Sequence, residues 1–392
     1  MNILVFSTNS HYRKQPIGGA ETSLRFIAEK LARVGEKVVY VTGSDRKLPG
    51  LKVQEINGVK VYFISPLKWP SWKKGTVSPM KLRFTRFQLR LALGLILKKE
   101  QSQLVHTYSE SDTYEVLRVR KRYRIPVKVV IRQAGLWFRY ACAADPVQRK
   151  RTEEVYNEVD QIAFISPGLK DMFFAEIDKL GMKVQNKNIT VLDIGFNNNV
   201  FRGKWIYPKA PPFRLVMVAR LTFTDKRQDL LIQALSLLGD ANVELHLVGD
   251  GPNRHRLVDL AEELKVRDRT FFHGFIDQEK VQDILLNSHL FCISTNNEGL
   301  CKSVIEAMSI GLPVVASDVG SLNTFIQDGK NGFLTPNDTE SWAKTIRAAL
   351  SDRQRLESIS QSEIDFVRSH YDPDANVLKY REIFQYVLSR HP

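Results

Sequence analysis

Short apolar runs alternate along the chain with longer stretches in which apolar positions recur every three or four residues. The longer stretches have the spacing of amphipathic helices, as in Ala20–Arg33, which Gly35 follows as a stop signal. The short runs have the length and composition of buried strands. In the first half they predict strands at 3–7, 37–42, 53–56, 59–64, 104–106, 127–131, 162–165 and 189–192.

A turn signal and a linker interrupt this series of predicted strands and helices. The Asn57-Gly58 pair between two apolar runs is typical of a tight hairpin turn. The segment 195–212, rich in Gly and Pro, interrupts the alternation and predicts a linker. The alternation then restarts, with strands expected at 213–219, 243–248, 270–273, 290–293 and 313–316, and helices at 228–238, 254–264 and 373–388.

Apolar strands separated by helices favour parallel sheets that are covered on both faces. We therefore expect an α/β protein with two Rossmann-like domains facing each other, residues 1–200 and 201–372. Periodicity alone does not say on which domain the last helix, within 373–392, packs.

The composition is that of an ordinary globular protein, with 43% hydrophobic and 26% charged residues. The three cysteines, Cys142, Cys292 and Cys301, form no Cys-x-x-Cys pair, so we expect neither a disulfide framework nor a cysteine zinc site, which fits a reducing cytoplasm. No secretory signal precedes the first apolar run. The apolar stretch near Leu91–Leu97 is far shorter than the roughly 20 residues that span a membrane.

The net charge of +14 is distributed unevenly. Residues 1–200 contain 34 Lys and Arg and 18 Asp and Glu, whereas residues 201–392 contain 23 and 25. Most of the excess lies in 51–150, with 21 basic and 6 acidic residues. This asymmetry favours an anionic partner for the first half, and a merely solubilising surface is the alternative. We expect no nucleic-acid partner, because no DNA- or RNA-binding motif is recognisable.

In each half, one candidate ligand motif follows the first strand. Gly18 and Gly19 precede the first helix, where they would let a ligand approach the backbone; the alternative is a plain strand-to-helix turn. Arg220 and Lys226 follow the strand at 213–219, where two cations could clamp a diphosphate; alone, they would be solvated surface charges.

Further candidates follow later strands. Glu298 and Glu306 are eight residues apart and lie around the start of a predicted helix, whose free N–H groups could meet a phosphate. The turn Gly249–Pro252 is more typical of a structural role. His106 ends a strand, where a histidine is more often packed than catalytic. There is no HExxH, GKS/T, GxSxG or Cys/His cluster, so no metal or cofactor is expected.

The stretch Met80–Lys99 mixes leucines with six cations, and Trp69, Trp72, Lys73 and Lys74 precede it. Cations beside exposed aromatic residues suit an anionic bilayer surface. For Leu89–Leu97 we favour an ordinary helix whose apolar face packs in the core. For the tryptophans and nearby cations, both interpretations stay open.

The chain resembles the retaining glycosyltransferases of family GT4, which have the GT-B fold. The resemblance extends over essentially the whole sequence. It rests on GGAE (Gly18–Glu21), ARLTFTDKRQDLL (Ala219–Leu231), GDGP (Gly249–Pro252), HGF (His273–Phe275) and above all EGLCKSVIEAMSIGLPVVASDVG (Glu298–Gly320). The two glutamates in that last context are highly specific, which a lone pair at this spacing would not be.

The resemblance implies roles for individual residues. Arg220 and Lys226 match the pair that grips the donor diphosphate. Glu298 matches the residue that holds the donor sugar, and Glu306 the one that binds the ribose. The remaining donor-binding matches are Gly18 and Gly19 in the closing loop, Ile276 beside the base, and Gly299, Leu300 and Cys301 at the phosphates. The final helix would cross back to the first domain.

One departure concerns the catalytic groups. Many family members have a histidine just after the strand at 127–131, where this chain reads Arg132-Gln133. Gln133 is one candidate substitute, and His106 is another near the same crevice. The catalytic candidates are then Glu298, Arg220, Lys226, His106 and Gln133.

The expected function is transfer of a sugar from a nucleotide diphosphate sugar to an acceptor hydroxyl with retention of configuration, in the synthesis of polysaccharide, lipopolysaccharide or glycolipid. We expect a cytoplasmic protein and leave open whether it attaches to the inner face of the cell membrane, where an anionic lipid-linked acceptor would lie. The alternatives are a non-catalytic nucleotide-sugar-binding protein and a transferase that acts on a soluble acceptor.

Overall fold

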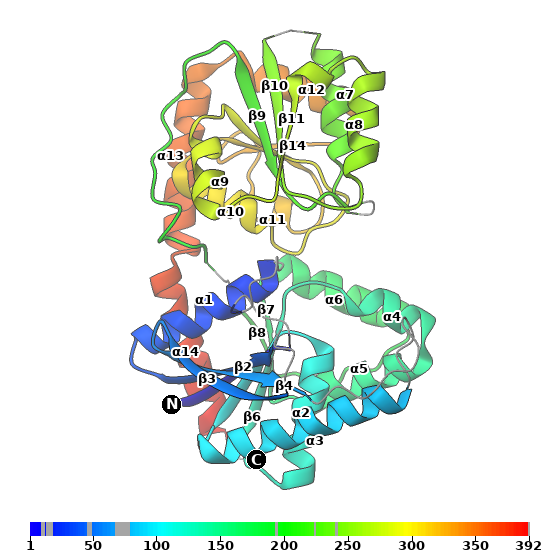
Figure 1. Ribbon diagram of the computed structural model, residues 1–392. Helices are drawn as coiled ribbons and strands as arrows, with labels where there is room; N and C mark the ends of the chain where they lie inside the picture. The colour runs from blue at the N-terminus through cyan, green and yellow to red at the C-terminus, as the bar shows by residue number, and fades with distance from the viewer. Residues whose placement is uncertain are drawn as a thin grey trace. The chain divides into compact units, whose positions relative to one another are not determined.

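The computed structural model describes residues 1–8, 12, 19–44, 49–66, 79–192, 195–222, 225–239 and 242–390. The chain divides into two compact units. Unit 1 comprises Met1–Ile165, Lys170–Ile194 and Asp374–Pro392, and unit 2 comprises Ser166–Leu169 and Gly195–Pro373. The two Rossmann-like domains with parallel sheets that the sequence predicts are confirmed, and the last helix belongs to unit 1 (Figure 1).

Unit 1 is built on an eight-stranded sheet in the order β3-β4-β2-β1-β5-β6-β7-β8. Among the described strands of this sheet, only β3 and β4 pair antiparallel, through the predicted hairpin, in which Asn57 (φ 52°) and Gly58 (φ 77°) are both left-handed. The strands are β1 (Asn2–Phe6), β2 (Lys37–Gly43), β3 (Gly50–Ile56), β4 (Val59–Ser65), β5 (Leu104–Thr107), β6 (Lys128–Gln133), β7 (Gln161–Phe164) and β8 (Ile189–Val191).

Helices cover both faces of this sheet. They are α1 (Gly19–Arg33), α2 (Pro79–Lys99), α3 (Glu110–Tyr123), α4 (Phe138–Ala144), α5 (Pro146–Glu158), α6 (Pro167–Lys179) and α14 (Pro373–Ser389). Two successive residues of β5 contact helices on opposite faces of the sheet. The ring of His106 lies 5.3 Å from the ring of Phe384 on α14, whereas Thr107 Oγ1 lies 2.7 Å from Thr113 Oγ1 on α3. Helices α14 and α3 therefore pack on opposite faces.

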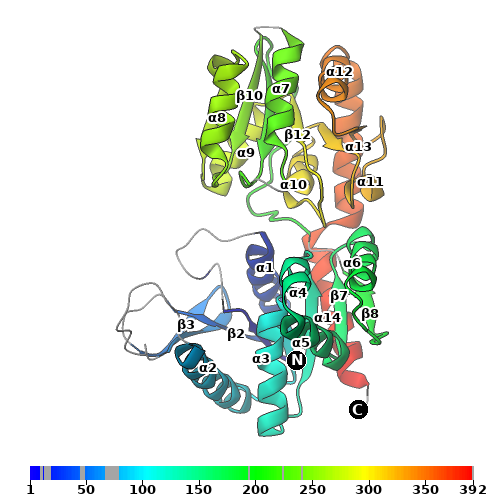
Figure 2. The ribbon, with the colours of Figure 1, turned by 90° about the vertical axis from the view of Figure 1, so that its right-hand side faces the viewer.

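Helix α2 lies beside α3 (Figure 2). Its apolar side chains include both buried and exposed ones. Leu93, Ile96 and Leu97 are buried, as expected for a helix that packs on the core. Leu91 and Leu95, in contrast, are exposed on another side of the helix. Trp69, Trp72, Lys73 and Lys74 lie outside the described residues.

Unit 2 is built on a six-stranded, wholly parallel sheet in the order β11-β10-β9-β12-β13-β14. Its strands are β9 (Phe213–Val218), β10 (Val243–Val248), β11 (Thr270–Gly274), β12 (Leu290–Ile293), β13 (Val314–Ser317) and β14 (Phe333–Thr335). Its helices are α7 (Gln228–Leu238), α8 (Arg254–Glu263), α9 (Gln278–Leu286), α10 (Lys302–Ile310), α11 (Leu322–Phe325), α12 (Thr339–Leu350) and α13 (Arg353–His370). The sequence assigned no element to the segments that form β14 and α11–α13.

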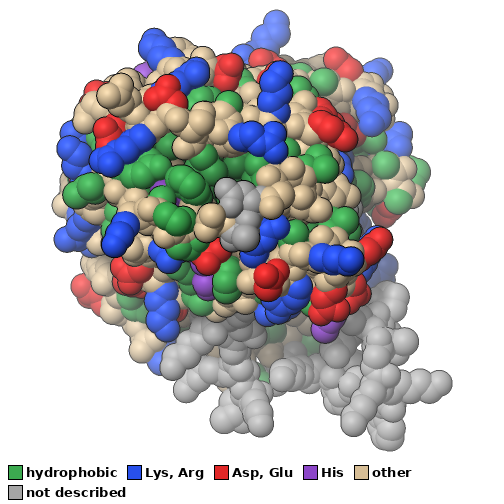
Figure 3. Space-filling view, turned by 90° about the horizontal axis from the view of Figure 1, so that it is seen from above, with side chains coloured by type: hydrophobic (Ala, Val, Ile, Leu, Met, Phe, Trp, Pro, Cys, Tyr) green, Lys and Arg blue, Asp and Glu red, His purple; other side chains and the backbone are tan. Residues whose placement is uncertain are grey.

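Charge on unit 2 is mixed. On the face seen in Figure 3, Lys and Arg side chains alternate with Asp and Glu rather than gathering by sign. This agrees with the nearly balanced charge of residues 201–392. Within the described part of the chain, no helix has the length and apolar character needed to cross a membrane.

Candidate functional site

The donor-binding candidates of unit 2 lie at one edge of its sheet. Arg220 and Lys226 follow β9, the turn Gly249–Pro252 follows β10, Ile276 follows β11, and Glu298 follows β12. These four strands are neighbours in the sheet and are parallel. Their carboxyl ends therefore share an edge, which is where open α/β sheets bind ligands.

Lys226 joins the β9 loop to the segment after β12. Its Nζ forms an ion pair with Glu298 Oε2, and its backbone forms an antiparallel bridge with Thr295. Arg220 is exposed, and no carboxylate within the described residues forms a salt bridge with it. Lys226 and Glu298 thus meet between the loops after β9 and β12, and Arg220 lies on the first of these loops. Residues 223–224 of that loop lie outside the described part.

The backbone around Glu298 is held firmly. The N–H and Oγ of Ser321 both donate to the carbonyl oxygen of Glu298, at 3.3 and 3.0 Å. Gly299, Leu300 and Cys301 then lead into α10, with Cys301 at the N-cap position. The Cys301 side chain makes no capping hydrogen bond, so it does not occupy the amides of the first turn. A helix start of this kind can receive an anion.

Glu306 lies on α10, eight residues after Glu298 and four after Lys302, the first residue of the helix. It is buried, and burial raises the pKa of its carboxyl group, an effect that Lys302 opposes. The distance between Lys302 Nζ and Glu306 Oε1 is 3.8 Å. A largely desolvated carboxylate gains most from a ligand that donates hydrogen bonds, such as a diol.

The glycines of the β10 turn have a structural role. A Cβ on Gly249 would lie 2.1 Å from the carbonyl oxygen of Ala219, and a Cβ on Gly251 would lie 2.2 Å from that of Leu221. In addition, the amide of Leu221 donates to the carbonyl of Asp250 at 3.1 Å. The turn therefore packs directly against the backbone on both sides of Arg220 and fixes that residue's position, as the structural interpretation of this motif predicted.

Three other candidates are less informative. Ile276 is half-buried just beyond β11. Gly19 is the first residue of α1, and Gly18 lies outside the described residues. Nothing in their described surroundings assigns them a ligand.

His106 is not placed to act on a substrate. It is wholly buried, with its ring 5.9 Å from that of Tyr380 and 5.3 Å from that of Phe384. Burial, with a smaller contribution from the Arg132 cation, lowers its pKa to about 3. The strand end points this side chain into the interface with α14, so we correct the expectation that it is catalytic: it is a neutral core residue.

Gln133 is also buried, but it belongs to a polar network that sequence analysis did not identify. Tyr156 Oη donates to Glu110 Oε1 at 2.6 Å and lies 2.9 Å from Gln133 Oε1. Gln133 Nε2 donates to the carbonyl of Gly135 and, at 3.4 Å, to Glu110 Oε1. Gln133 therefore supports Glu110 instead of facing a ligand itself. Glu110 and Tyr156 belong to no sequence motif, so no signal in the chain pointed to them.

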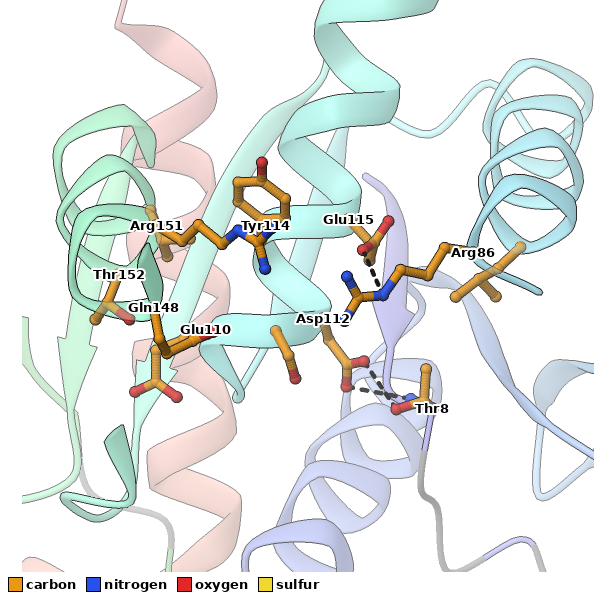
Figure 4. A pocket seen from close by; sticks show the side chains of 12 residues that line it. Thr8, Arg86, Glu110, Asp112, Tyr114, Glu115, Gln148, Arg151 and Thr152 are labelled. Carbon is orange, nitrogen blue, oxygen red and sulfur yellow. Dashed lines mark hydrogen bonds and ion pairs between the residues drawn. The ribbon is translucent and has the colours of Figure 1, made fainter. Parts of the chain in front are cut away.

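Glu110 lines a pocket of about 180 Å³ in unit 1 (Figure 4). The pocket lies at the start of α3, between α2 and α5, beside Thr8, which follows β1. Asp112 fixes the Thr8 wall by accepting from its N–H and Oγ, at 3.2 and 2.8 Å. Two arginines also line the pocket, Arg86 from α2 and Arg151 from α5. Across the described ranges, no three His, Cys, Asp or Glu side chains are grouped so that they could hold a metal ion.

Comparisons with known proteins agree with this architecture. Residues 17–192 match the model of Glycosyltransferase Family 4, and residues 204–365 match that of Glycosyl transferases group 1. A sucrose-phosphate synthase from Thermosynechococcus elongatus has a similar fold, with a TM-score of 0.78, 20% identity and 99% of each chain covered. HepE from Anabaena, solved in complex with UDP, superimposes with a TM-score of 0.74 at 18% identity, over 98% of this chain and 100% of its own.

A relative is also found by sequence. A phosphatidylinositol N-acetylglucosaminyltransferase subunit from Arabidopsis thaliana is 23% identical over 336 residues, which cover 85% of this chain and 71% of that protein. Fold and site thus define a glycosyltransferase of the GT-B type. Within that class, the chain belongs to glycosyltransferase family GT4.

Proposed function

We propose that the protein transfers a sugar from a nucleotide diphosphate sugar, with a uridine diphosphate as leaving group, to a hydroxyl of an anionic, lipid-linked acceptor. Configuration would be retained, as in the retaining family that the sequence resembles. The UDP bound by HepE supports the choice of base. The name of the Arabidopsis relative, which includes phosphatidylinositol, supports a lipid acceptor that carries a phosphate.

The observation that carries the donor half of the proposal is the placement of Arg220, Lys226 and Glu298 at the carboxyl edge of β9 and β12. When the bond to the sugar breaks, negative charge develops on the departing diphosphate. Two fixed cations and the amides at the start of α10 would stabilise that charge without reorganising. In this proposal they supply the neutralisation that a metal ion supplies in other transferases.

The proposed mechanism asks little covalent chemistry of the protein. Glu298 would orient the sugar through its hydroxyls, and Lys226 would be shared between this carboxylate and the diphosphate. Buried Glu306 would accept hydrogen bonds from the ribose hydroxyls. Alignment of the acceptor hydroxyl with the anomeric carbon would then supply much of the rate enhancement.

Helix α2 supports the membrane half of the proposal. Its outermost positions recur every four residues, from Arg83 through Phe87 and Leu91 to Leu95, and the two exposed lysines Lys98 and Lys99 close the line. The three apolar side chains are 51%, 42% and 62% exposed. The sequence of α2 contains no acidic residue. An apolar line bracketed by cations is suited to an anionic bilayer surface.

The donor proposal is tested by a screen in which release of the free nucleotide is measured for several UDP, GDP and ADP sugars. We expect UDP sugars to be turned over and an Arg220→Ala, Lys226→Ala double variant to be inactive with all of them. Nucleotide-sugar binding without turnover, with any acceptor extract, would instead favour the non-catalytic alternative. Absence of any nucleotide binding would refute the proposal.

The membrane proposal is tested by co-sedimentation with vesicles of phosphatidylcholine, with and without 30% phosphatidylglycerol, at low and high salt. Each cation near an anionic surface contributes about 1 kcal/mol, so binding should require the anionic lipid and weaken with salt. Replacing Phe87, Leu91 and Leu95 by Ser should reduce it strongly. Replacing exposed Ile206 and Leu237 of unit 2 by Ser is the matched control. Equal binding by both variants would show that α2 is not the membrane contact, and absence of binding to anionic vesicles at low salt would favour a soluble acceptor.

A further inference from the structure

We propose that the pocket between α2, α3 and α5 of unit 1 binds a small hydroxylated anion, with Glu110 accepting a hydrogen bond from its hydroxyl and Arg151 pairing with its negative charge. The ligand would be the polar head of the acceptor, so its role in the reaction rests on the proposed function. The binding chemistry itself rests only on residues of unit 1.

The size and position of the pocket suit such a ligand. Its volume of about 180 Å³ leaves room for a small polyol. It lies where β1 and β5 end, because Thr8 follows β1 and Glu110, the first residue of α3, comes three positions after the last residue of β5. The carboxyl ends of parallel strands are where ligands enter α/β domains.

Glu110 has the geometry of a prepared hydrogen-bond acceptor. It is only 9% exposed, and one oxygen, Oε1, is held by Tyr156 and Gln133. The backbone N–H of Glu110 also contributes a hydrogen bond to this carboxyl group, no side chain among the described residues donates to the other oxygen, Oε2, and the residue lines the pocket. Figure 4 shows Glu110 leaving the first turn of α3 toward α5. With Oε1 already held by the protein, the carboxylate can accept a further hydrogen bond from a ligand through Oε2.

Arg151 supplies the opposite charge. It extends from α5 toward Tyr114 on α3, and its guanidinium carbon lies 5.7 Å from the centre of that ring (Figure 4). No carboxylate in the described residues forms a salt bridge with it. Arg86, on the other wall, differs because its Nε lies 3.7 Å from Glu115, which Arg90 also binds. Of the two pocket arginines, Arg151 therefore has the charge available for a ligand.

A carboxylate and a cation in one small pocket select for a ligand with two matching groups. Glu110 would repel a simple anion that has no hydrogen to donate, and Arg151 gives little to a neutral polyol. A phosphate or carboxylate on a hydroxylated carbon skeleton satisfies both residues. Asp112 does not compete for the ligand, because its two oxygens already accept from Thr8.

The test is calorimetry on the full chain saturated with UDP. The soluble probes are myo-inositol 1-phosphate, glycerol 3-phosphate and L-malate, with myo-inositol and inorganic phosphate as the single-group counterparts. Detergent micelles containing phosphatidylinositol test whether the same chemistry is recognised only in a lipid headgroup. We expect at least one two-group probe, soluble or micellar, to bind at least tenfold more tightly than either counterpart.

The variants separate ligand contact from structure. Glu110→Gln and Arg151→Gln should each weaken binding of that probe at least tenfold. Arg151→Gln should also abolish the preference over the neutral polyol. Lys150→Gln removes the same charge from a neighbouring position on α5, one residue earlier, and should change nothing. Tyr156→Phe, a positioning change, should weaken binding less than Glu110→Gln.

The outcomes are distinct for the two proposals. If none of the probes binds in either form, or if binding survives both Glu110→Gln and Arg151→Gln, the pocket proposal is overturned. Arg151 is not buried, so its variant keeps the test valid even if Glu110→Gln impairs folding. If UDP does not bind but a probe binds in an Arg151-dependent manner, the donor proposal fails and the pocket proposal stands.

Discussion

Arg220 and Lys226 are the residues whose loss should cost most activity. Replacing either by Ala should lower turnover by about 10²–10³-fold, the scale of one lost contact to transition-state charge. Lys226→Ala also leaves Glu298 without its ion-pair partner, so it should be the more damaging of the two. Steady-state rates with the preferred donor measure the effect, and exposed Lys344→Ala on α12 is the control for charge. Near-normal rates in both folded variants would rule out the proposal that Arg220 and Lys226 bind the diphosphate.

Glu298 and Glu306 should affect different steps, although they share one motif. Glu306→Ala removes a buried acceptor and should mainly weaken binding of the free nucleotide diphosphate. Glu298→Ala should leave nucleotide affinity largely intact while impairing transfer and discrimination among donor sugars. Calorimetry with UDP and kinetics with several UDP sugars separate the two effects. The assigned roles would be wrong if both variants lost nucleotide affinity equally.

His106 should influence stability, not catalysis. Its pKa is about 3 in the folded protein, against about 6.5 for an exposed histidine, so the unfolded chain binds an extra proton between these values. The contribution of neutral His106 to stability is therefore complete above pH 6.5 and is lost as the pH falls toward 3, by up to about 1.4 kcal/mol per pH unit. In denaturant unfolding, the free energy of unfolding of His106→Phe should fall less steeply between pH 6.5 and 4.5 than that of the unchanged protein. An unchanged slope would contradict this account.

At the scale of elements, the turn after β10 and the loop after β9 behave as one piece. Gly249→Ala should destabilise unit 2 by several kcal/mol, because its Cβ would overlap the carbonyl of Ala219 and its φ of 130° is unfavourable for other residues. Gly239→Ala is a matched control, since Gly239 also has a positive φ, 68°, but has open space around it. It should cost only about 1 kcal/mol. Thermal unfolding measures both, and equal losses would mean that strain in φ, not the close approach, decides.

The edge of the unit 2 sheet that carries the donor-binding candidates could be predicted, because each of these motifs directly follows a strand. Strand positions are set by local apolar runs, and a parallel sheet brings the residues after each strand to one edge. The pocket of unit 1 could not be predicted in this way. Glu110, Arg151 and Thr8 come from three segments far apart in the sequence, and none has a recognisable spacing.

Two further differences have physical causes at the same scale. The burial of His106 could not be predicted, because a strand end alone does not tell which face of the sheet a side chain lies on. In β5 that face is covered by α14, which is distant in the sequence. The exposed apolar side of α2 could not be predicted either, because apolar residues surround this helix and periodicity does not single out the side that packs.

At the scale of the whole molecule, α14 links the two units, because it follows unit 2 along the chain but packs in unit 1. It follows unit 2 in sequence but is joined to unit 1 by ion pairs between Lys30 and Asp374, at 2.5 Å, and between Glu36 and Arg381, at 2.6 Å. Tyr380 and Phe384 are wholly buried against the unit 1 sheet. The core of unit 1 is thus completed only when the last residues of the chain are present.

Two core variants should therefore destabilise different units. Phe384→Ala leaves a cavity beside His106 and should lower the stability of unit 1 by about 3–5 kcal/mol, while Trp342→Ala on α12 should do the same to unit 2. Calorimetric unfolding would show which transition shifts. UDP affinity provides an independent readout, because the proposed donor residues lie in unit 2: it should persist in Phe384→Ala at temperatures where Trp342→Ala has lost it. If both variants lost UDP binding together, the two units would unfold as one, and the stability of the donor site would depend on α14 as well.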